Sequence, residues 1–337
     1  MIPERRQTSV RTGTVVVVVA SGVFLLGLVT RLTVRDTYSG FATLYYATPW
    51  PVLAGLIILV AGGLRIRNNS SFARPLAAVG IILLIGGFWP GRGNPATADT
   101  TGTTLSCLTW NAAHGRDGWK PVAATVRSAA ADLVCLVEAG PTGPVQERFW
   151  ENAFPGHGIS RLGSGMLVVV RNGSVRQTRS GSLGGAGRFR QFEITCRGRG
   201  LTVVVVDLKI TPWVSRRVPL EQLRTLAEEL GDRPLLVTGD FNTPSDSAWF
   251  DSWRDSLSNA WTTTGQGLRA TWPVPLPVLD LDQVWGNHRL RFLDCHGTWS
   301  THSDHRPLVT RFSITARQAR DQVSSRSQLH TMHPLID

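Results

Sequence analysis

The chain has 337 residues, a formal net charge of +11 at pH 7 and 42% hydrophobic residues. The excess of positive charge favours anionic partners such as phospholipid headgroups or nucleic acid. The chain lacks a dense basic run with interleaved aromatic residues, however, which weakens the case for nucleic acid. Its four cysteines have no metal-ligand spacing, which argues against a cysteine-based zinc site. Cys107 and Cys135 lie inside apolar runs, so we expect buried free thiols there.

Three long uncharged stretches occupy most of the first ninety residues: 12–30, 37–64 and 75–91. A membrane span needs roughly 20 apolar residues, with about 17 as the lower limit, so the third stretch is marginal. We predict a membrane anchor over residues 1–91 with about three transmembrane helices, or two if the last helix lies in the interface. A cleaved signal peptide is the alternative for the first stretch, but that stretch is long and lacks a small-x-small cleavage site.

The distribution of arginines predicts the orientation of this anchor. Six of them lie near the N-terminus or between the second and third stretches: Arg5, Arg6, Arg11, Arg65, Arg67 and Arg74. Cytoplasmic segments of membrane proteins carry an excess of Lys and Arg. We therefore expect a multi-pass protein of the cell membrane with residues 92–337 outside the cytoplasm. Residues 92–104 are small and polar, which predicts a short flexible tether that keeps the following domain close to the bilayer.

Four apolar runs in the rest of the chain each end on a polar residue. Their last residues are Asn111, Glu138, Asp207 and Asp240. Short runs rich in Val and Leu and followed by turn residues are typical of buried strands. A polar residue at the end of such a run lies at the carboxyl end of the strand, which is where α/β sheets build their functional sites.

Two short phrases add further polar groups: Gly239-Asp240-Phe241-Asn242 and Ser303-Asp304-His305. Carboxylates can hold a hard divalent cation, an amide and an imidazole can hold phosphate oxygens, and an aspartate can align a water molecule. The first phrase alone is compatible with an ordinary Asx turn. Both phrases together, with the four strand ends, indicate a metal site that cleaves phosphoesters.

These motifs make residues 104–314 resemble the endonuclease/exonuclease/phosphatase superfamily of deoxyribonuclease-like, metal-dependent phosphohydrolases. The matching phrases are Thr109-Trp110-Asn111, Leu136-Val137-Glu138, Gly239-Asp240-Phe241-Asn242, Leu281-Asp282-Gln283-Val284 and Ser303-Asp304-His305-Arg306-Pro307. The resemblance implies a four-layer α/β sandwich, with two packed mixed sheets flanked by helices, here preceded by an N-terminal helical membrane anchor. We place the catalytic domain at residues 105–314 and expect a disordered tail at 315–337.

The resemblance also implies a Mg²⁺- or Mn²⁺-dependent hydrolase of phosphoesters and suggests its metal ligands. Glu138 matches the principal ligand, with Asn111 beside it and Asp304 as a further ligand. Asp207 is an additional candidate ligand, discussed below.

Four other residues match groups that act on the substrate. Asp240 would orient or deprotonate the attacking water, and Asn242 would hold a phosphate oxygen. His305 would bind or protonate the phosphate, while Asp282 would accept a hydrogen bond from His305. Such a carboxylate fixes the imidazole tautomer and favours its charged form.

The sequence departs from the family pattern at Asp207, where members usually have a His or a Tyr. An anion at this position would repel phosphate unless a metal or a cation intervenes. Side chains two residues apart in a strand share a face, so Lys209 could stand beside Asp207. Asp207 would then bind metal or hold Lys209 toward the phosphate; a solvated Lys209 at the strand end is the alternative.

Two further features have plain structural interpretations. For Arg216 and Arg217 we expect a solvated helix start, with phosphate binding as the alternative. Thr271-Trp272-Pro273 resembles a phrase common in the superfamily, and packing of the domain is the plain interpretation of Trp272.

The sequence as a whole favours a monomeric, membrane-anchored phosphohydrolase that acts on lipid-linked phosphates or pyrophosphates. A phosphodiesterase, either a surface nuclease or a sphingomyelinase-like enzyme, is the alternative enzyme. A binding module without activity is a third interpretation, prompted only by Asp207.

Overall fold

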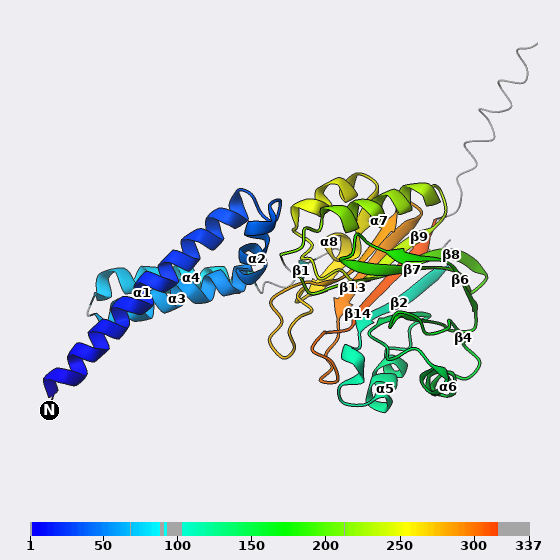
Figure 1. Cartoon of the computed structure of the whole chain (residues 1–337), viewed down its shortest axis with the longest axis horizontal. Coiled ribbons are helices and arrows are strands. Elements are labelled where there is room, and N and C mark those ends of the chain that lie inside the picture. The colour runs from blue at the N-terminus through cyan, green and yellow to red at the C-terminus, as the bar shows by residue number, and fades with distance from the viewer. Residues whose placement is uncertain (1, 68, 88–90, 93–102, 212, 316–337) are drawn as a thin grey trace, which may run out of the picture.

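The computed structural model describes residues 2–67, 69–87, 91–92, 103–211 and 213–315. A group of helices extends from one side of an α/β domain, and the N-terminus lies at the far end of this group (Figure 1). The predicted order, an N-terminal helical part followed by a sandwich domain, is confirmed.

Four helices form the N-terminal part: α1 (Ile2–Leu32), α2 (Ser39–Ala47), α3 (Trp50–Ile66) and α4 (Ser70–Gly87). Two segments, Gly13–Leu32 and Ser70–Gly87, are long and apolar enough to cross a membrane, and α2 with α3 makes a third, bent by 69°. The bend falls at Pro49 and Pro51, because proline fits the start of a helix but not its interior. The uncharged stretch that is interrupted is therefore the second one, which forms α2 and α3. The third stretch, whose length was marginal for a membrane span, forms the single helix α4.

Small residues bring these helices close together. A Cβ atom on Gly63 of α3 would lie 3.0 Å from the carbonyl oxygen of Gly13 on α1. One on Gly80 of α4 would lie 2.6 Å from the side chain of Ile57 on α3. Small residues at helix crossings are the usual means by which helices pack in membranes, where apolar side chains gain nothing by leaving lipid.

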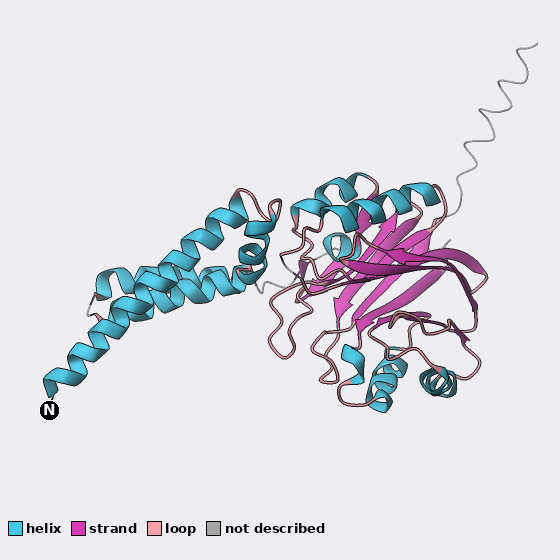
Figure 2. Cartoon of the chain, in the orientation of Figure 1, coloured by secondary structure: helices cyan, strands magenta, loops and turns pink. Residues whose placement is uncertain are grey.

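Two β-sheets form the centre of the domain (Figure 2). The larger has the strand order β1-β11-β13-β14-β2-β3-β5-β4, and the smaller has the order β10-β12-β9-β8-β7-β6. In these orders the strands of the larger sheet are Gly91–Arg92, Gly265–Gly267, Leu290–Gly297, Leu308–Ile314, Thr104–Asn111, Leu133–Val137, Leu167–Val170 and Gly158–Ile159. Those of the smaller sheet are Leu257–Asn259, Asp282–Asn287, Leu235–Asp240, Arg199–Leu208, Gly187–Cys196 and Ser174–Ser182.

Helices cover the outer faces of both sheets. The larger sheet packs against α5 (Trp119–Ala129) and α6 (Pro144–Ala153). The smaller sheet packs against α7 (Arg217–Leu230) and a 3₁₀ segment, Ala248–Asp255. The short helix α8 (Ala260–Thr264) follows β10. The result is the four-layer α/β sandwich that the sequence predicted.

The apolar runs are continuous because the strands that contain them, such as β3, β5 and β9, are buried on both faces. In β8, Val203 and Val205 point into the core between the sheets, whereas Val204 and Val206 pack under α7. This alternation follows from the two-residue period of a strand. The cysteines belong to the same interior, and all four are buried free thiols.

The chain returns to the domain directly after the helical part. Gly91 and Arg92 form β1, which pairs antiparallel with β11. The start of the predicted tether is therefore part of a sheet. The end of the predicted tether, Thr104, is likewise the first residue of β2. Residues 93–102 of the tether, and the predicted tail apart from its first residue, lie outside the described residues.

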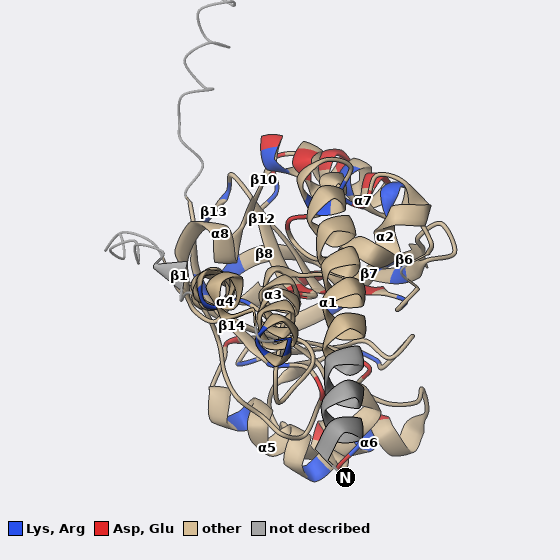
Figure 3. Cartoon of the chain, turned by 90° about the vertical axis from the view of Figure 1, so that its left-hand side faces the viewer, with Lys and Arg blue, Asp and Glu red and all other residues tan. Residues whose placement is uncertain are grey.

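The α1–α2 loop joins the helical part to the domain through buried polar contacts. Asp36, which is 1% exposed, accepts hydrogen bonds from the Ser247 hydroxyl and from the backbone N–H of Ala248, at 2.5 and 2.9 Å. Arg31 forms an ion pair with Asp246 at 2.7 Å. Figure 3, viewed from the side of the helices, shows them projecting from this face of the domain. The joint thus fixes which edge of the sandwich faces the helical part.

Candidate active site

The two sheets bring the polar strand ends to one edge of the domain. In the smaller sheet, Asp207, Asp240 and Asp282 are register partners across β8, β9 and β12. In the larger sheet, β2 ends at Asn111, and Glu138 directly follows the parallel strand β3. A cavity of about 770 Å³ opens at this edge. Its lining includes eight of the nine predicted site residues: Asn111, Glu138, Asp207, Lys209, Asp240, Asn242, Asp304 and His305.

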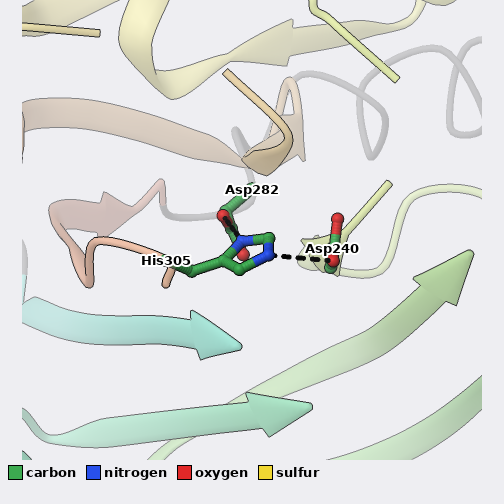
Figure 4. Close-up of side chains that lie close together, drawn as sticks. All are labelled: Asp240, Asp282 and His305. Atoms are coloured by element: carbon green, nitrogen blue, oxygen red, sulfur yellow. Dashed lines mark hydrogen bonds and ion pairs between the residues drawn. The ribbon is translucent and has the colours of Figure 1, made fainter. Parts of the chain in front are cut away.

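The ninth residue, Asp282, lies behind His305 and is 2% exposed. Its Oδ2 is 2.7 Å from Nδ1 of His305, while Nε2 of His305 is 3.9 Å from Oδ2 of Asp240 (Figure 4). Burial by itself would lower the pKa of His305, but the charges on Asp282 and Asp240 outweigh it and raise that pKa to about 10. The imidazole is therefore a cation at neutral pH, held with one nitrogen on Asp282.

Asp240 is 1% exposed and held by three hydrogen bonds. Asn111 Nδ2 and Asn242 Nδ2 donate to its Oδ2 at 2.9 and 3.1 Å, and the Asn242 backbone N–H donates to its Oδ1 at 2.8 Å. Burial raises the pKa of Asp240 to about 7, and the charge on Asp282 adds to the rise, while His305 opposes it. A carboxylate with a pKa near neutrality suits a group that accepts a proton from water.

Backbone strain is concentrated at this edge. Glu138 and Asn242 have φ of 52° and 43°, a left-handed conformation that residues other than glycine seldom adopt. Asn242 Nδ2 also donates to the carbonyl oxygen of Leu208 at 2.6 Å, which ties the strained turn to the end of β8. Strained residues of this kind persist where the surrounding structure holds them, and they cluster at functional sites.

The cavity offers a set of oxygen donors suited to a hard divalent cation. Glu138 and Asp207 both line this cavity, and burial, followed by the charge on Glu138, raises the pKa of Asp207 to about 6. A divalent cation between the two carboxylates would relieve that repulsion. Asp304 accepts a hydrogen bond from Trp272 Nε1 at 3.3 Å and also lines the cavity. The chemistry of these donors therefore fits Mg²⁺ or Mn²⁺, although the carboxylates of Glu138, Asp207 and Asp304 do not form a group within 4.8 Å of one another in the described part of the chain.

Among the described residues, the potential ligand atoms of Asp240, Asp282 and His305 do lie within 4.8 Å of one another. Here the imidazole itself carries the positive charge, and both of its nitrogens face carboxylates. With both ring nitrogens directed at carboxylates, His305 is placed to hold a proton rather than a metal ion.

The neighbour of Asp207 differs from the one expected. Lys209 does not stand beside it: its Nζ donates to the carbonyl oxygen of Gly185 at 3.2 Å. Strand β8 ends at Leu208, so the two-residue alternation does not extend to Lys209. The register partner of Asp207 is Arg188 on β7, whose charge lowers the pKa of Asp207.

The structure also corrects two plain interpretations. Arg216 is not a solvated helix start: it is 2% exposed, and its Nη2 donates to the carbonyl oxygens of Lys209 and Asn242 at 2.7 and 3.3 Å. Arg217 is exposed, as expected. Trp272 does more than pack the domain, because it lines the cavity and donates to Asp304.

The family model for the endonuclease/exonuclease/phosphatase family matches residues 108–305, which include every motif of this site. This chain belongs to that family. Its fold is accordingly that of a family of phosphoesterases, which includes nucleases and phosphatases. No curated protein matches the sequence of the chain.

Solved structures of the endonuclease/exonuclease/phosphatase family share the sandwich. A family member from Bacteroides thetaiotaomicron has 16% identity and a TM-score of 0.52, covering 64% of this chain and 100% of its own. A mannosyl-6-phosphatase from the same species has 15% identity and a TM-score of 0.52, with coverages of 62% and 99%. The catalytic domain of human Nocturnin with a bound sulfate anion has 17% identity and a TM-score of 0.50, with coverages of 63% and 94%. At these identities the likeness concerns the fold.

Proposed function

We propose that this protein is a membrane-anchored, divalent-metal-dependent phosphohydrolase that acts outside the cytoplasm on lipid-linked phosphates. The observation that carries the proposal is the pairing, in one cavity, of a charged His305 and a buried Asp240 with an oxygen-rich wall that includes Glu138 and Asp304. One wall suits a phosphate and its attacking water, and the other suits a cation.

Each group has a role in phosphoester hydrolysis. Glu138, Asp304, Asn111 and Asp207 would hold the cation, which when bound supplies charge stabilisation to the phosphate. Asp240, held by two amides, accepts a proton from the attacking water. His305, oriented by Asp282, binds a phosphate oxygen and can give its proton to the leaving oxygen. These are electrostatic and proton-transfer roles, and none requires a covalent intermediate.

Apolar side chains around the cavity support a lipid-linked substrate. Ile210, which lines the cavity, is 65% exposed, and Trp213 in the same loop is 66% exposed. On the loop that follows Trp272, Leu276 is 68% exposed. Burying such side chains in a lipid interface would be favourable, whereas in water their exposure is costly.

The joint with the helices supports the same conclusion. The Tyr46 hydroxyl on α2 donates to Asp36 at 2.9 Å and interacts with the guanidinium of Arg216, which holds the backbone at Lys209 and Asn242. The loops beside the cavity are thus next to the helical part. If α1 and α4 cross a membrane, the cavity lies near the surface of that same membrane.

The experiment is turnover by the full chain purified in detergent. We expect Mg²⁺- or Mn²⁺-dependent release of p-nitrophenol from p-nitrophenyl phosphate, and a loss of at least a hundredfold in Glu138→Gln, which removes the main anionic ligand while keeping its shape. Glu151→Gln, an exposed site on α6, is the matched control.

Three outcomes would contradict the proposal in different ways. Faster turnover of bis-p-nitrophenyl phosphate than of the monoester would favour a phosphodiesterase. No turnover of these two compounds or of a lipid-linked diphosphate would favour a binding module. Near-normal turnover by Glu138→Gln at saturating Mg²⁺ would refute the assignment of the metal ligand.

A further inference from the structure

The cavity has two cationic side chains that the hydrolytic roles above do not use. Arg188 and Lys209 both line it and are both exposed. Neither forms an ion pair within 4.0 Å of a carboxylate in the described part of the chain, although Arg188 acts on Asp207 at longer range. Exposed cations at the wall of a cavity, with no close carboxylate partner, are available to an anionic ligand.

Their position relative to the hydrolytic groups follows from the sheet. Arg188, Asp207, Asp240 and Asp282 are successive register partners on β7, β8, β9 and β12. Neighbouring strands are about 4.8 Å apart, so the backbone of Arg188 is roughly 10 Å from that of Asp240. An arginine side chain spans most of this distance. The guanidinium of Arg188 can therefore contact a substituent of a phosphate that is bound at Asp240 and His305.

We propose that Arg188 and Lys209 form a second anion subsite, which binds the inner phosphate of a diphosphate whose terminal phosphate lies at Asp240 and His305. This inference rests on the proposed function and narrows its substrate class from phosphates in general to diphosphates. The guanidinium fork of Arg188 suits the two free oxygens of a phosphate, and Lys209 adds a point charge.

The hydrolysis then has a simple balance. The oxygen of a water molecule forms a bond to the terminal phosphorus, and the bond from that phosphorus to the bridging oxygen breaks. The bridging oxygen leaves with the electron pair on the inner phosphate. Asp240 takes a proton from the water, and His305 gives one to the leaving phosphate. The products are orthophosphate and the monophosphate of the remaining group. Arg188 and Lys209 stabilise charge that develops on the leaving phosphate, which a monoester of an alcohol would not use.

Apolar side chains next to the subsite could contact an apolar chain that is esterified to the inner phosphate. Ile210 is the next residue after Lys209 and lines the same cavity, and the exposed Trp213 follows in this loop. A chain attached to the inner phosphate would leave the cavity past these side chains and toward the helical part. A single cation, Arg188, is enough to neutralise the charge on Asp207. Neutralisation of Asp207 therefore does not explain why Lys209 also lines the cavity.

The first test measures binding without turnover. Methylenediphosphonate and methylphosphonate, which enzymes of this kind cannot hydrolyse, are titrated by calorimetry into the full chain in detergent with Mg²⁺. We expect the diphosphonate to bind at least tenfold more tightly, and Arg188→Ala to remove most of that preference. Arg188→Lys should restore part of it. Arg199→Ala, an exposed arginine at the opposite end of β8, is the matched control and should keep it.

The second test compares hydrolysis of farnesyl diphosphate and farnesyl monophosphate. We expect a higher kcat/KM for the diphosphate and at least a tenfold fall of that ratio in Arg188→Ala. Equal binding of the two phosphonates, or a preference that Arg188→Ala leaves intact, would overturn the subsite even if both farnesyl compounds are hydrolysed. A preference for the diphosphonate without hydrolysis of either compound would leave the subsite standing and refute the proposed function.

Discussion

The hydrogen bond between Asp282 and His305 is the contact whose removal we expect to be most informative. A pKa of about 10 in place of the usual 6.5 means that the protein favours the imidazolium by about 5 kcal/mol. Burial opposes this preference, and the two carboxylates produce it. The carboxylates together therefore contribute more than this net value; Asp282 is 2.7 Å from the ring and Asp240 is 3.9 Å from it, so we assign the larger part, at least about 3 kcal/mol, to Asp282.

Asp282→Asn should therefore lower the pKa of His305 by about two pH units, to about 8. His305 must be protonated to act, so activity is present below its pKa and is lost as the pH rises through it. Asp240 must be ionised, so activity is also lost as the pH falls through its pKa of about 7. The profile of kcat/KM against pH should be bell-shaped, and Asp282→Asn should move the alkaline limb from about 10 to about 8.

The assay is phosphate release by the full chain at saturating Mg²⁺ between pH 6 and 10.5. The matched control is Asp294→Asn, which removes a carboxylate 2.9 Å from His296, a pair that does not line the cavity. The control should leave both limbs in place. An alkaline limb that stays near 10 in Asp282→Asn, while circular dichroism shows that the variant is folded, would refute the inference that the charge on Asp282 raises the pKa of His305.

Three further predictions concern Asp207 and Lys209 in the cavity, the joint with the helical part, and the side of the membrane on which the domain lies. Asp207→Asn should raise the Mg²⁺ concentration needed for half-maximal rate, whereas Lys209→Ala should raise KM and leave that concentration unchanged; identical Mg²⁺ dependence in the Asp207 variant would exclude a ligand role. Asp36→Asn should destabilise the detergent-solubilised chain by about 2 kcal/mol, because it weakens the buried charge-assisted hydrogen bonds of the joint, and an unchanged thermal midpoint would show that the joint contributes nothing. A reporter enzyme that works only outside the cytoplasm should be active when fused after Ile314 and silent when fused near Asn69, and the opposite pattern would place the active site in the cytoplasm.

The joint also links the helical part to the loops beside the cavity. Arg216 is buried between Tyr46 of α2 and the backbone carbonyls of Lys209 and Asn242. Its guanidinium therefore connects the helical part to the turn that holds Asn242 in its strained conformation. The Nε and Nη1 of this guanidinium are buried without a hydrogen-bond partner among the residues that the structure describes, and the isolated domain, without α2, lacks the Tyr46 side chain that interacts with Arg216 in the full chain.

Much of the sandwich can be predicted from the sequence because its signals are local. Strands buried on both faces appear as continuous apolar runs, as in Val203–Val206 of β8. Polar residues at the ends of such runs, among them Asp207 and Asp240, could be assigned to one sheet edge. The phrases around Asp240 and His305 then indicated which edge carries the chemistry.

One residue that the sequence analysis missed did have a local signal. Arg197 and Gly198 have φ of 48° and 73° and form a two-residue turn between β7 and β8. Such a turn fixes the register of a hairpin, so counting outward from it places Arg188 opposite Asp207. The sequence therefore contained the partner of Asp207, although the alternation rule pointed to Lys209.

Other features were decided only by the tertiary structure. Lys209 lies beyond the end of β8, where the chain turns and its side chain reaches Gly185. Arg216 is buried because α2, about 170 residues earlier in the chain, packs beside it. Local patterns determine which residues form strands and where those strands end, because backbone periodicity is a local property. Which side chains meet at a site depends on the packing of distant segments, and only the folded chain determines that packing.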